Sequence, residues 1–139
     1  MERTLVLVKP SGVRRGLVGE VISRIERRGL IVRAARMLVV TKDMAERHYA
    51  EHQGKGFYEE LVEHITSAPI FAMVVEGPEA VRVVRMMMGA TNPLEAAPGT
   101  VRGDFGLDVR QNVVHSADSL ASADREIRIF FPDGVDLLG

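Results

Sequence analysis

The sequence contains no cysteine and no tryptophan, and it has only two tyrosines and five phenylalanines among its 139 residues. Without cysteine, a disulfide scaffold and thiolate chemistry are both excluded. The formal net charge is −1, so the chain lacks the basic excess that duplex-binding domains use to neutralise phosphates. A main role in binding nucleic acid is therefore disfavoured, although a local cationic pocket remains compatible with this balance.

Long hydrophobic runs are also missing from the chain. The apolar stretch near the start, within Thr4–Val8, is only five residues long and lies between charged residues. A membrane span needs about 20 apolar residues, and a signal peptide needs a longer apolar segment with a small-residue cleavage site. We therefore expect no membrane association and a cytoplasmic location. Apolar residues make up 46% and charged residues 27%, as in globular proteins, and the length fits one domain over residues 1–139.

Four strand-like segments alternate with helical patterns. The strands are expected at 4–9, 30–40, 70–76 and 126–131, and the helices at 17–28, 43–52, 57–66 and 79–88, with a short helix from about residue 118. Asp43 and Glu46 form a plausible capping pair for the second helix, and Gly89 closes the fourth. Strands interleaved with helices predict an α/β sandwich, of the α+β class, but they do not give the strand order.

The segment from about 89 to 113 has no clean periodicity and is rich in glycine and proline. A run this long without regular structure is uncommon inside a compact domain and is usually functional. His115 follows it directly, in the sequence Asn112–Ser119. A histidine in this place can serve as nucleophile, general base or metal ligand. The alternative is a surface histidine that precedes a helix capped by Asp118 or Ser119.

Cationic and hydroxyl side chains recur around this segment: Lys9, Arg85, Thr91 and Arg102. Phosphoryl transfer depends on several fixed charges, and arginine and lysine supply them. The alternative is that these residues are ordinary solvated charges, because spacing alone does not distinguish them from the remaining basic residues.

Two short motifs point elsewhere, but weakly. His48–His52 matches the H-x-x-E-H pattern of a class of zinc metallopeptidases. Such an enzyme needs a third ligand and a substrate cleft, for which a single domain of this size leaves little room. Arg102-Gly103-Asp104 matches a cell-adhesion tripeptide, an improbable role for a chain without cysteine or a secretion signal. A solvated helix face accounts equally well for the first motif.

Three segments, ERTLVLVKPSGV, ATNPLEAAPGTVRGDFGLDV and NVVHSADS, together resemble the nucleoside diphosphate kinase family. The resemblance extends from Arg3 to about Phe131. It implies a ferredoxin-like βαββαβ fold, in which helices cover a four-stranded antiparallel sheet. It also implies Mg²⁺-dependent, ping-pong transfer of a γ-phosphate, mainly from ATP, to a nucleoside diphosphate through a phosphohistidine.

The same resemblance implies individual roles. His115 matches the nucleophile, phosphorylated on its pros nitrogen, and Glu126 matches the carboxylate that orients its ring. Phe57 matches the aromatic ring that stacks on any base, so ADP, GDP, CDP, UDP and their deoxy forms would all be accepted. The remaining active-site positions are matched by Lys9, Tyr49, Arg85, Thr91, Arg102 and Asn112. Mg²⁺ would arrive on the phosphates without a dedicated protein site, and the chain would form a homo-oligomer, a hexamer in preference to a tetramer.

The sequence departs from the usual family pattern at several positions. Ser11 replaces the Asp of KPDG, Arg110 stands where Gly is common, and Ser116 and Ala117 replace Gly and Ser after the histidine. Glycine is often kept where φ is positive, so we expect Ser116 to have a positive φ and its hydroxyl to reach the following helix. Two alternatives remain: a regulatory relative with slow turnover, and a nucleic-acid-binding ferredoxin-like domain, disfavoured by few aromatics and the net charge.

Overall fold

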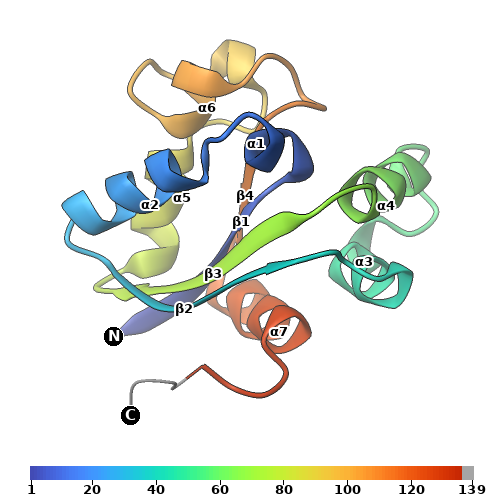
Figure 1. Cartoon of the computed structure of the whole chain (residues 1–139), viewed down its shortest axis with the longest axis horizontal. Helices are drawn as coiled ribbons and strands as arrows, with labels where there is room; N and C mark the ends of the chain where they lie inside the picture. The colour runs from blue at the N-terminus through green and yellow to red at the C-terminus, as the bar shows by residue number, and fades with distance from the viewer. Residues whose placement is uncertain (136–139) are drawn as a thin grey trace.

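The computed structural model describes residues 1–135 and contains one four-stranded antiparallel sheet (Figure 1). Its strands are β1 (Glu2–Val8), β2 (Ile31–Leu38), β3 (Ile70–Gly77) and β4 (Val114–Ser116), in the order β2-β3-β1-β4. The expected ferredoxin-like, antiparallel α+β fold is confirmed. The last four residues of the expected 1–139 domain lie outside the described residues.

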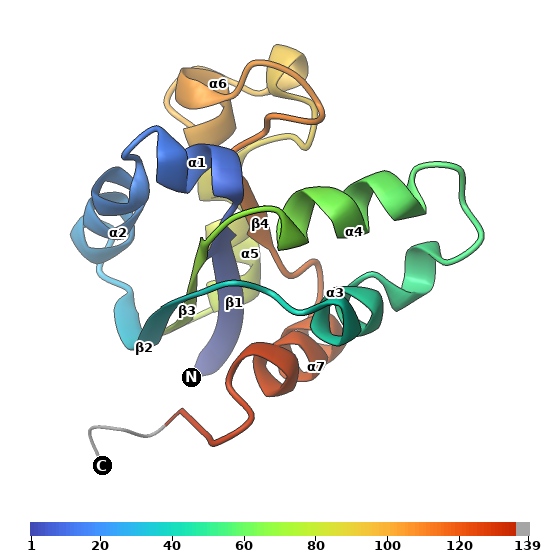
Figure 2. The ribbon, with the colours of Figure 1, turned by 45° about the vertical axis from the view of Figure 1, so that its right-hand side comes forward.

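Helices cover both faces of this sheet, as the turned view also shows (Figure 2). One face packs against α3 (Lys42–His48), α4 (Tyr58–Thr66) and α7 (Leu120–Phe130), and the other against α2 (Val18–Arg27) and α5 (Ala80–Met88). The shorter elements are α1 (Pro10–Arg14), η1 (Ala50–His52), η2 (Pro93–Glu95) and α6 (Val101–Phe105).

The apolar run near the start becomes the centre of the core because β1 lies between two other strands and is covered on both faces. Leu5 and Leu7 pack toward α3, α4 and α7, whereas Val6 and Val8 pack toward α2 and α5. All four are fully buried. Burying one such side chain stabilises the fold by about 1.5–3 kcal/mol.

The register between β1 and β4 places His115, the candidate functional histidine, next to this core. His115 of β4 lies opposite Leu7 of β1 in an antiparallel pair, and such partners direct their side chains to the same face of a sheet. His115 therefore faces the layer formed by α3 and α7. Two elements far apart in the sequence thus supply its neighbours.

The expected strand at 126–131 is wrong. These residues belong mostly to α7, and the fourth strand is instead the three-residue β4. Alternation of Glu, Ile and Arg in EIRIF imitates a strand, but Ala123, Glu126 and Phe130 are buried at helical spacing. Tertiary packing of this buried face therefore favours the helix over the strand.

Three smaller expectations also need correction. The helix expected over 43–52 ends as α3 at His48, and its N-cap is Thr41, whose side chain accepts a hydrogen bond from Met44 N. The segment 89–113 is not structureless, because it contains η2 and α6, each capped by a side chain. Helix α1 was not expected, since Pro10 suggested only the end of a strand. Proline is nevertheless well suited to the first turn of a helix.

Candidate active site

Two adjoining cavities open above the sheet where β1, β4 and the 89–113 segment meet. The smaller, of about 150 Å³, contains charged groups, and the larger, of about 830 Å³, extends along α4. They share six lining residues: Lys9, Tyr49, His52, Thr91, Asn112 and His115. All nine residues expected at the site line one or both cavities, so segments far apart in the sequence do converge.

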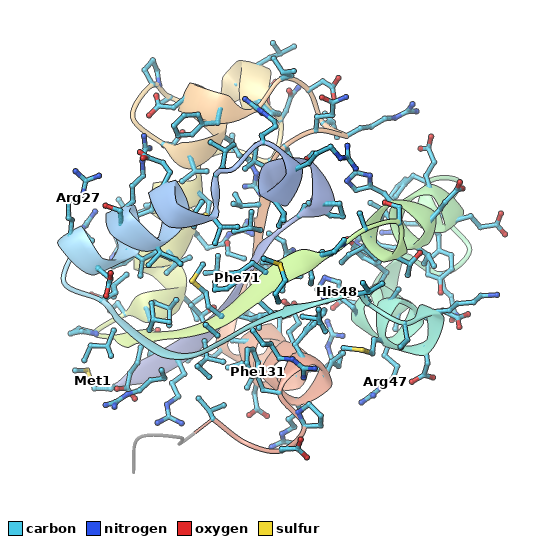
Figure 3. All side chains as sticks on the ribbon, in the orientation of Figure 1. Met1, Arg27, Arg47, His48, Phe71 and Phe131 are labelled. Carbon is cyan, nitrogen blue, oxygen red and sulfur yellow. The ribbon has the colours of Figure 1, made fainter. Side chains whose placement is uncertain are left out.

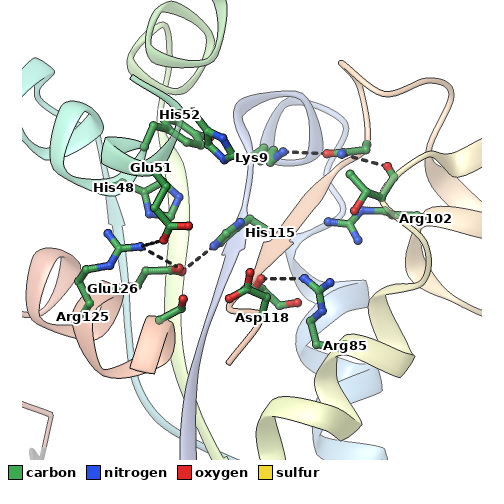
Figure 4. A pocket seen from close by; sticks show the side chains of 15 residues that line it. Lys9, His48, Glu51, His52, Arg85, Arg102, His115, Asp118, Arg125 and Glu126 are labelled. Atoms are coloured by element: carbon green, nitrogen blue, oxygen red, sulfur yellow. Dashed lines mark hydrogen bonds and ion pairs between the residues drawn. The ribbon is translucent and has the colours of Figure 1, made fainter. Parts of the chain in front are cut away.

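His115 and Glu126 form the shortest contact in the smaller cavity. The ring Nε2 lies 2.6 Å from Glu126 Oε1 (Figure 4). Glu126 is only 4% exposed, and burial raises the pKa of its carboxyl, while Arg125, 3.9 Å away, opposes that rise. An ionised Glu126 accepts a hydrogen bond from Nε2–H, and this tautomer leaves a lone pair on Nδ1. The free nitrogen is the pros nitrogen.

The charge state of His115 follows from its surroundings. Burial, and then the positive charges of Lys9, Arg102 and Arg85, lower the pKa of the imidazole to about 3. The side chain nevertheless remains 23% exposed to the cavity. The ring is therefore neutral at pH 7 and accessible, which is the state that a nitrogen nucleophile requires.

Two cations, the buried Arg102 and the partly buried Lys9, are held in fixed positions beside it. Arg102 donates to the carbonyls of Gly89 and Val114 at 2.8 and 2.7 Å, and it is 5% exposed. Lys9 donates to Asn112 Oδ1 at 2.8 Å. Burial, reinforced by a neighbouring cation, lowers the pKa of Arg102 to about 10 and that of Lys9 to about 8. Neutral hydrogen-bond partners do not compensate these charges, so the cavity attracts an anion.

Arg85 and Asn112 connect the remaining parts of the site. Arg85 extends from α5 and approaches the carbonyl of Ser116 at 3.5 Å. The Asn112 amide donates to the carbonyl of Thr91 at 3.2 Å, which joins the two ends of the 89–113 segment.

Val113, immediately before β4, has φ 72°, an unfavourable conformation for a β-branched residue. The Val113 carbonyl accepts a hydrogen bond from Lys9 N at 2.8 Å, which connects the end of β1 to the start of β4. The strained backbone of Val113 therefore lies next to the site and is held by this hydrogen bond.

His48 is a site residue that the sequence alone did not reveal. Arg47 extends outward, whereas His48 turns inward (Figure 3), where its ring centroid lies 4.6 Å from that of His115. His48 is 4% exposed, and burial lowers its pKa to about 3. Within residues 1–135, neither of its ring nitrogens has a hydrogen-bond partner. A neutral ring thus forms one wall of the site. Its only sequence signal was the H-x-x-E-H match, which pointed to a different chemistry.

The metal-binding alternative is not supported by the geometry of the described residues. Atoms of His48, His115 and Glu126 lie within 4.8 Å of one another, and His52 does not belong to this group. The H-x-x-E-H histidines therefore do not converge. Two imidazoles and one carboxylate can bind zinc but are unsuited to Mg²⁺, which prefers oxygen ligands. The nearby cations Lys9, Arg102 and Arg85 repel any metal ion at this group. The tripeptide Arg102-Gly103-Asp104 is likewise unavailable for adhesion, because Arg102 is buried and Asp104 pairs with Arg24 at 2.8 Å.

Aromatic and apolar groups surround the outer part of the larger cavity. Phe57 is 47% exposed, and its ring contacts the His52 ring at 5.4 Å and the Lys55 ammonium at 5.9 Å. Leu61 and Val109 also line this end. The cavity is therefore cationic at one end and has a planar apolar platform at the other, a combination that fits a nucleotide.

Comparison with known proteins decides the family. The sequence model described as nucleoside diphosphate kinase matches residues 2–135. The chain belongs to the nucleoside diphosphate kinase family. It is 64% identical to a nucleoside diphosphate kinase of Archaeoglobus fulgidus over 133 residues, covering 96% of this chain and 88% of the relative. It is 54% identical to one from Listeria monocytogenes over 131 residues, covering 94% and 89%.

Solved nucleoside diphosphate kinases have the same fold. A halophilic enzyme from Halobacterium salinarum, in complex with CDP, matches with a TM-score of 0.95 at 46% identity, covering 99% of this chain and 91% of that one. A family protein from Babesia bovis matches with a TM-score of 0.93 at 45% identity, covering 96% and 90%. The chain is therefore an enzyme that acts on nucleotides and transfers a phosphoryl group from a nucleoside triphosphate to a nucleoside diphosphate.

The departures from the family pattern next to His115 have a different structural basis from the one expected. Ser116 does not have a positive φ; among residues 1–135, only Glu79 and Val113 do so without being glycine. Ser116 is the last residue of β4 and is 3% exposed. Among the described residues its hydroxyl has no hydrogen-bond partner, so the expected bond to the following helix is not formed. The cap of that helix is Ser119, which accepts from Ser122 N.

Proposed function

We propose that His115 carries the phosphoryl group during transfer. In the first step, the Nδ1 lone pair attacks the γ-phosphorus, the bond between that phosphorus and the bridging oxygen breaks, and the nucleoside diphosphate leaves. In the second step, a terminal oxygen of another nucleoside diphosphate attacks the phosphorus and the P–N bond breaks. The observation that most directly supports this proposal is the neutral, accessible imidazole of His115, whose Nε2 lies 2.6 Å from Glu126 Oε1.

Glu126 acts as the orienting partner of the nucleophile in this proposal. It fixes the tautomer that exposes Nδ1, and it stabilises the positive charge that develops on the ring as the P–N bond forms. His48 packs edge-on against the His115 ring and restricts its tilt. Both neighbours come from the helical layer that the antiparallel register places beside β4.

The cations hold the phosphates and stabilise the charge that spreads over the transferred group. Lys9, Arg85 and Arg102 come from three separate segments and converge on the smaller cavity. Phosphoryl transfer relies on such preorganised charges, since the protein performs little covalent work. Mg²⁺ would enter as part of the Mg·ATP substrate and would neutralise phosphate charge, so no ligand among residues 1–135 is assigned to it.

The remaining residues position the nucleoside. Tyr49, Thr91 and Asn112 line both cavities and are placed to contact the phosphates and ribose. Phe57 offers its exposed ring to the base, and stacking is tolerant because every base has a π-face. The CDP complex of the Halobacterium salinarum relative supports nucleotide binding in this fold.

The decisive experiment is transfer of radiolabel from γ-labelled ATP with Mg²⁺. We expect label on the wild-type protein that is acid-labile and base-stable, and that passes to added GDP. The His115→Ala variant should take up no label. Glu126→Gln should keep nucleotide affinity and take up label more slowly, whereas Glu79→Gln, a control at an exposed glutamate, should match the wild type. Label retained in His115→Ala would exclude this histidine as the carrier.

We also propose that the protein works as a homo-oligomer, a hexamer in preference to a tetramer. Exposed apolar side chains support this: Leu94 and Leu107 of the 89–113 segment are 82% and 63% exposed, and Met37 of the edge strand β2 is 53% exposed. Contact with other subunits would cover this apolar surface. Light scattering at micromolar concentration should give a mass near six chains, and a stable monomer would contradict the proposal.

We place the enzyme in the cytoplasm, where nucleoside triphosphates are abundant. Within residues 1–135, no helix has the length and apolar character needed to cross a membrane. Cell fractionation followed by an activity assay tests this location, and activity confined to a membrane fraction would contradict it.

A further inference from the structure

An ion pair spans the outer end of the larger cavity. Arg110, from the turn between α6 and β4, places Nη2 3.3 Å from Glu60 Oε1 on α4. Both residues line the cavity that Phe57, Leu61 and Val109 also line. The pair therefore joins two segments about fifty residues apart on the solvent-exposed side of the cavity. Arg110 is also a position where the family commonly has glycine.

Local structure holds both members of this pair in place. The Asp108 carboxylate accepts hydrogen bonds from Arg110 N and Gln111 N, both at 2.9 Å, which fixes the turn that carries Arg110. Glu60 lies three residues after Phe57 at the start of α4, and residues at this spacing share a helix face. Glu60 and Phe57 therefore lie on the same side of the start of α4, and the Arg110 guanidinium approaches Glu60 from the facing turn.

We propose that Arg110 and Glu60 read the edge of the base and favour guanine over adenine nucleotides as phosphoryl acceptors. The inference rests on the proposed function, because it requires the base to lie on Phe57. Shared ribose and phosphate contacts hold all nucleotides in one orientation, so the same edge of every purine meets the pair. Stacking on Phe57 then contributes an affinity that is similar for all bases, and the Arg110–Glu60 pair adds a modest preference for guanine.

The hydrogen-bonding groups of the two purines decide the direction of that preference. Guanine offers its O6 acceptor to the arginine, and its N1–H and N2–H₂ donors to the carboxylate. Adenine in the same orientation has a donor, N6–H₂, in place of O6 and an acceptor, N1, in place of N1–H. Adenine would therefore oppose donor to donor and acceptor to acceptor, and such mismatches are an effective basis for specificity.

The size of the preference is limited by exposure. The two side chains are 79% and 57% exposed, so water competes for each hydrogen bond. We expect GDP to react about three- to tenfold faster than ADP, the range of one or two modest hydrogen bonds. The enzyme therefore still accepts every base.

The test uses phosphorylated enzyme, prepared with ATP and freed of nucleotide, and measures the second-order rate of its dephosphorylation by GDP, IDP and ADP. IDP keeps O6 and N1–H but lacks the 2-amino group. Arg110→Gln should slow the reactions with GDP and IDP while leaving ADP nearly unchanged. Glu60→Gln should remove the advantage of GDP over IDP. Arg82→Gln is the matched control, because Arg82 forms an exposed pair with Glu79 at 3.5 Å within a single helix.

Three outcomes overturn the inference while leaving the proposed function intact. They are equal rates for GDP and ADP in the wild type, a preference for ADP, and a GDP-to-ADP ratio that does not change in Arg110→Gln. If Arg110→Gln slows all three acceptors equally, the pair only closes the cavity and the base-reading role is excluded. Failure to form any phosphorylated enzyme would contradict the proposed function itself, and this inference with it.

Discussion

The two ends of the proposed nucleotide-binding cavity are built differently. At the phosphate end, Arg102 is 5% exposed and bonded to two backbone carbonyls, and Lys9 is bonded to Asn112. At the base end, Phe57 is 47% exposed and the Arg110 side chain is 79% exposed. The chemistry requires fixed charges only where bonds form and break. The other end needs just a platform, so the two ends should respond very differently to substitution.

Arg102→Ala should have the largest effect among the binding residues. Its two hydrogen bonds preorganise a buried charge, and loss of such a donor lowers kcat/KM by about 10²-fold or more. Arg85→Ala should show a loss of similar size. Steady-state assays with ATP and GDP measure both, with Arg82→Ala as the exposed control. A loss of only a few-fold would mean that the phosphate end is no more demanding than the base end.

Lys9 should give the site an alkaline limit. Its pKa is lowered to about 8, so it carries its charge below pH 8 and loses it as the pH rises above that value. The profile of kcat/KM reports free-enzyme pKa values, so it should fall roughly tenfold per pH unit above pH 8 if the charge is essential. In Lys9→Arg the fall should move to higher pH. Because the His115 pKa is about 3, no acidic limb from this histidine should appear between pH 5 and 7. An unchanged alkaline limb in Lys9→Arg would exclude Lys9 as its source.

Phe57→Ala should have a smaller effect, and one shared by all bases. Stacking contributes about 1–3 kcal/mol per base, and the exposed ring favours the low end, a loss of about tenfold in affinity. Equilibrium binding of ADP, GDP and CDP to the unphosphorylated enzyme measures this loss. Phe57→Tyr is the conservative control and should bind normally. An effect confined to one base would contradict the platform role.

Ser116→Ala should have the smallest effect on catalysis. The hydroxyl is buried and has no partner in the part of the chain that the structure describes, so its removal should raise the free energy of unfolding by about 1 kcal/mol. Arg85 approaches only the backbone carbonyl of Ser116, so labelling of His115 should change by less than about twofold on the same grounds. Denaturant unfolding and single-turnover labelling measure the two quantities. A large loss of labelling would make the hydroxyl part of the catalytic machinery.

The sequence determined the kind of chemistry, because the residues that carry it are few and distinctive. Local apolar runs predicted β1, β2 and β3, and the helices over 17–28, 57–66 and 79–88 were expected within a few residues of their observed bounds. The motif around His115 predicted the family, which the comparisons confirmed. These features depend on neighbouring residues, which the sequence displays directly.

Tertiary structure decided what neighbouring residues leave open. The segment EIRIF has a pattern that suits a strand or a helix, and only packing of Ala123, Glu126 and Phe130 against the sheet selects the helix. That choice places Glu126 beside His115, and the antiparallel register of β4 turns His115 toward the same layer. The inward position of His48 and the Arg110–Glu60 pair likewise arise from contacts between distant segments. A sequence gives no distances between such segments, and the site exists only once the sheet order brings them together.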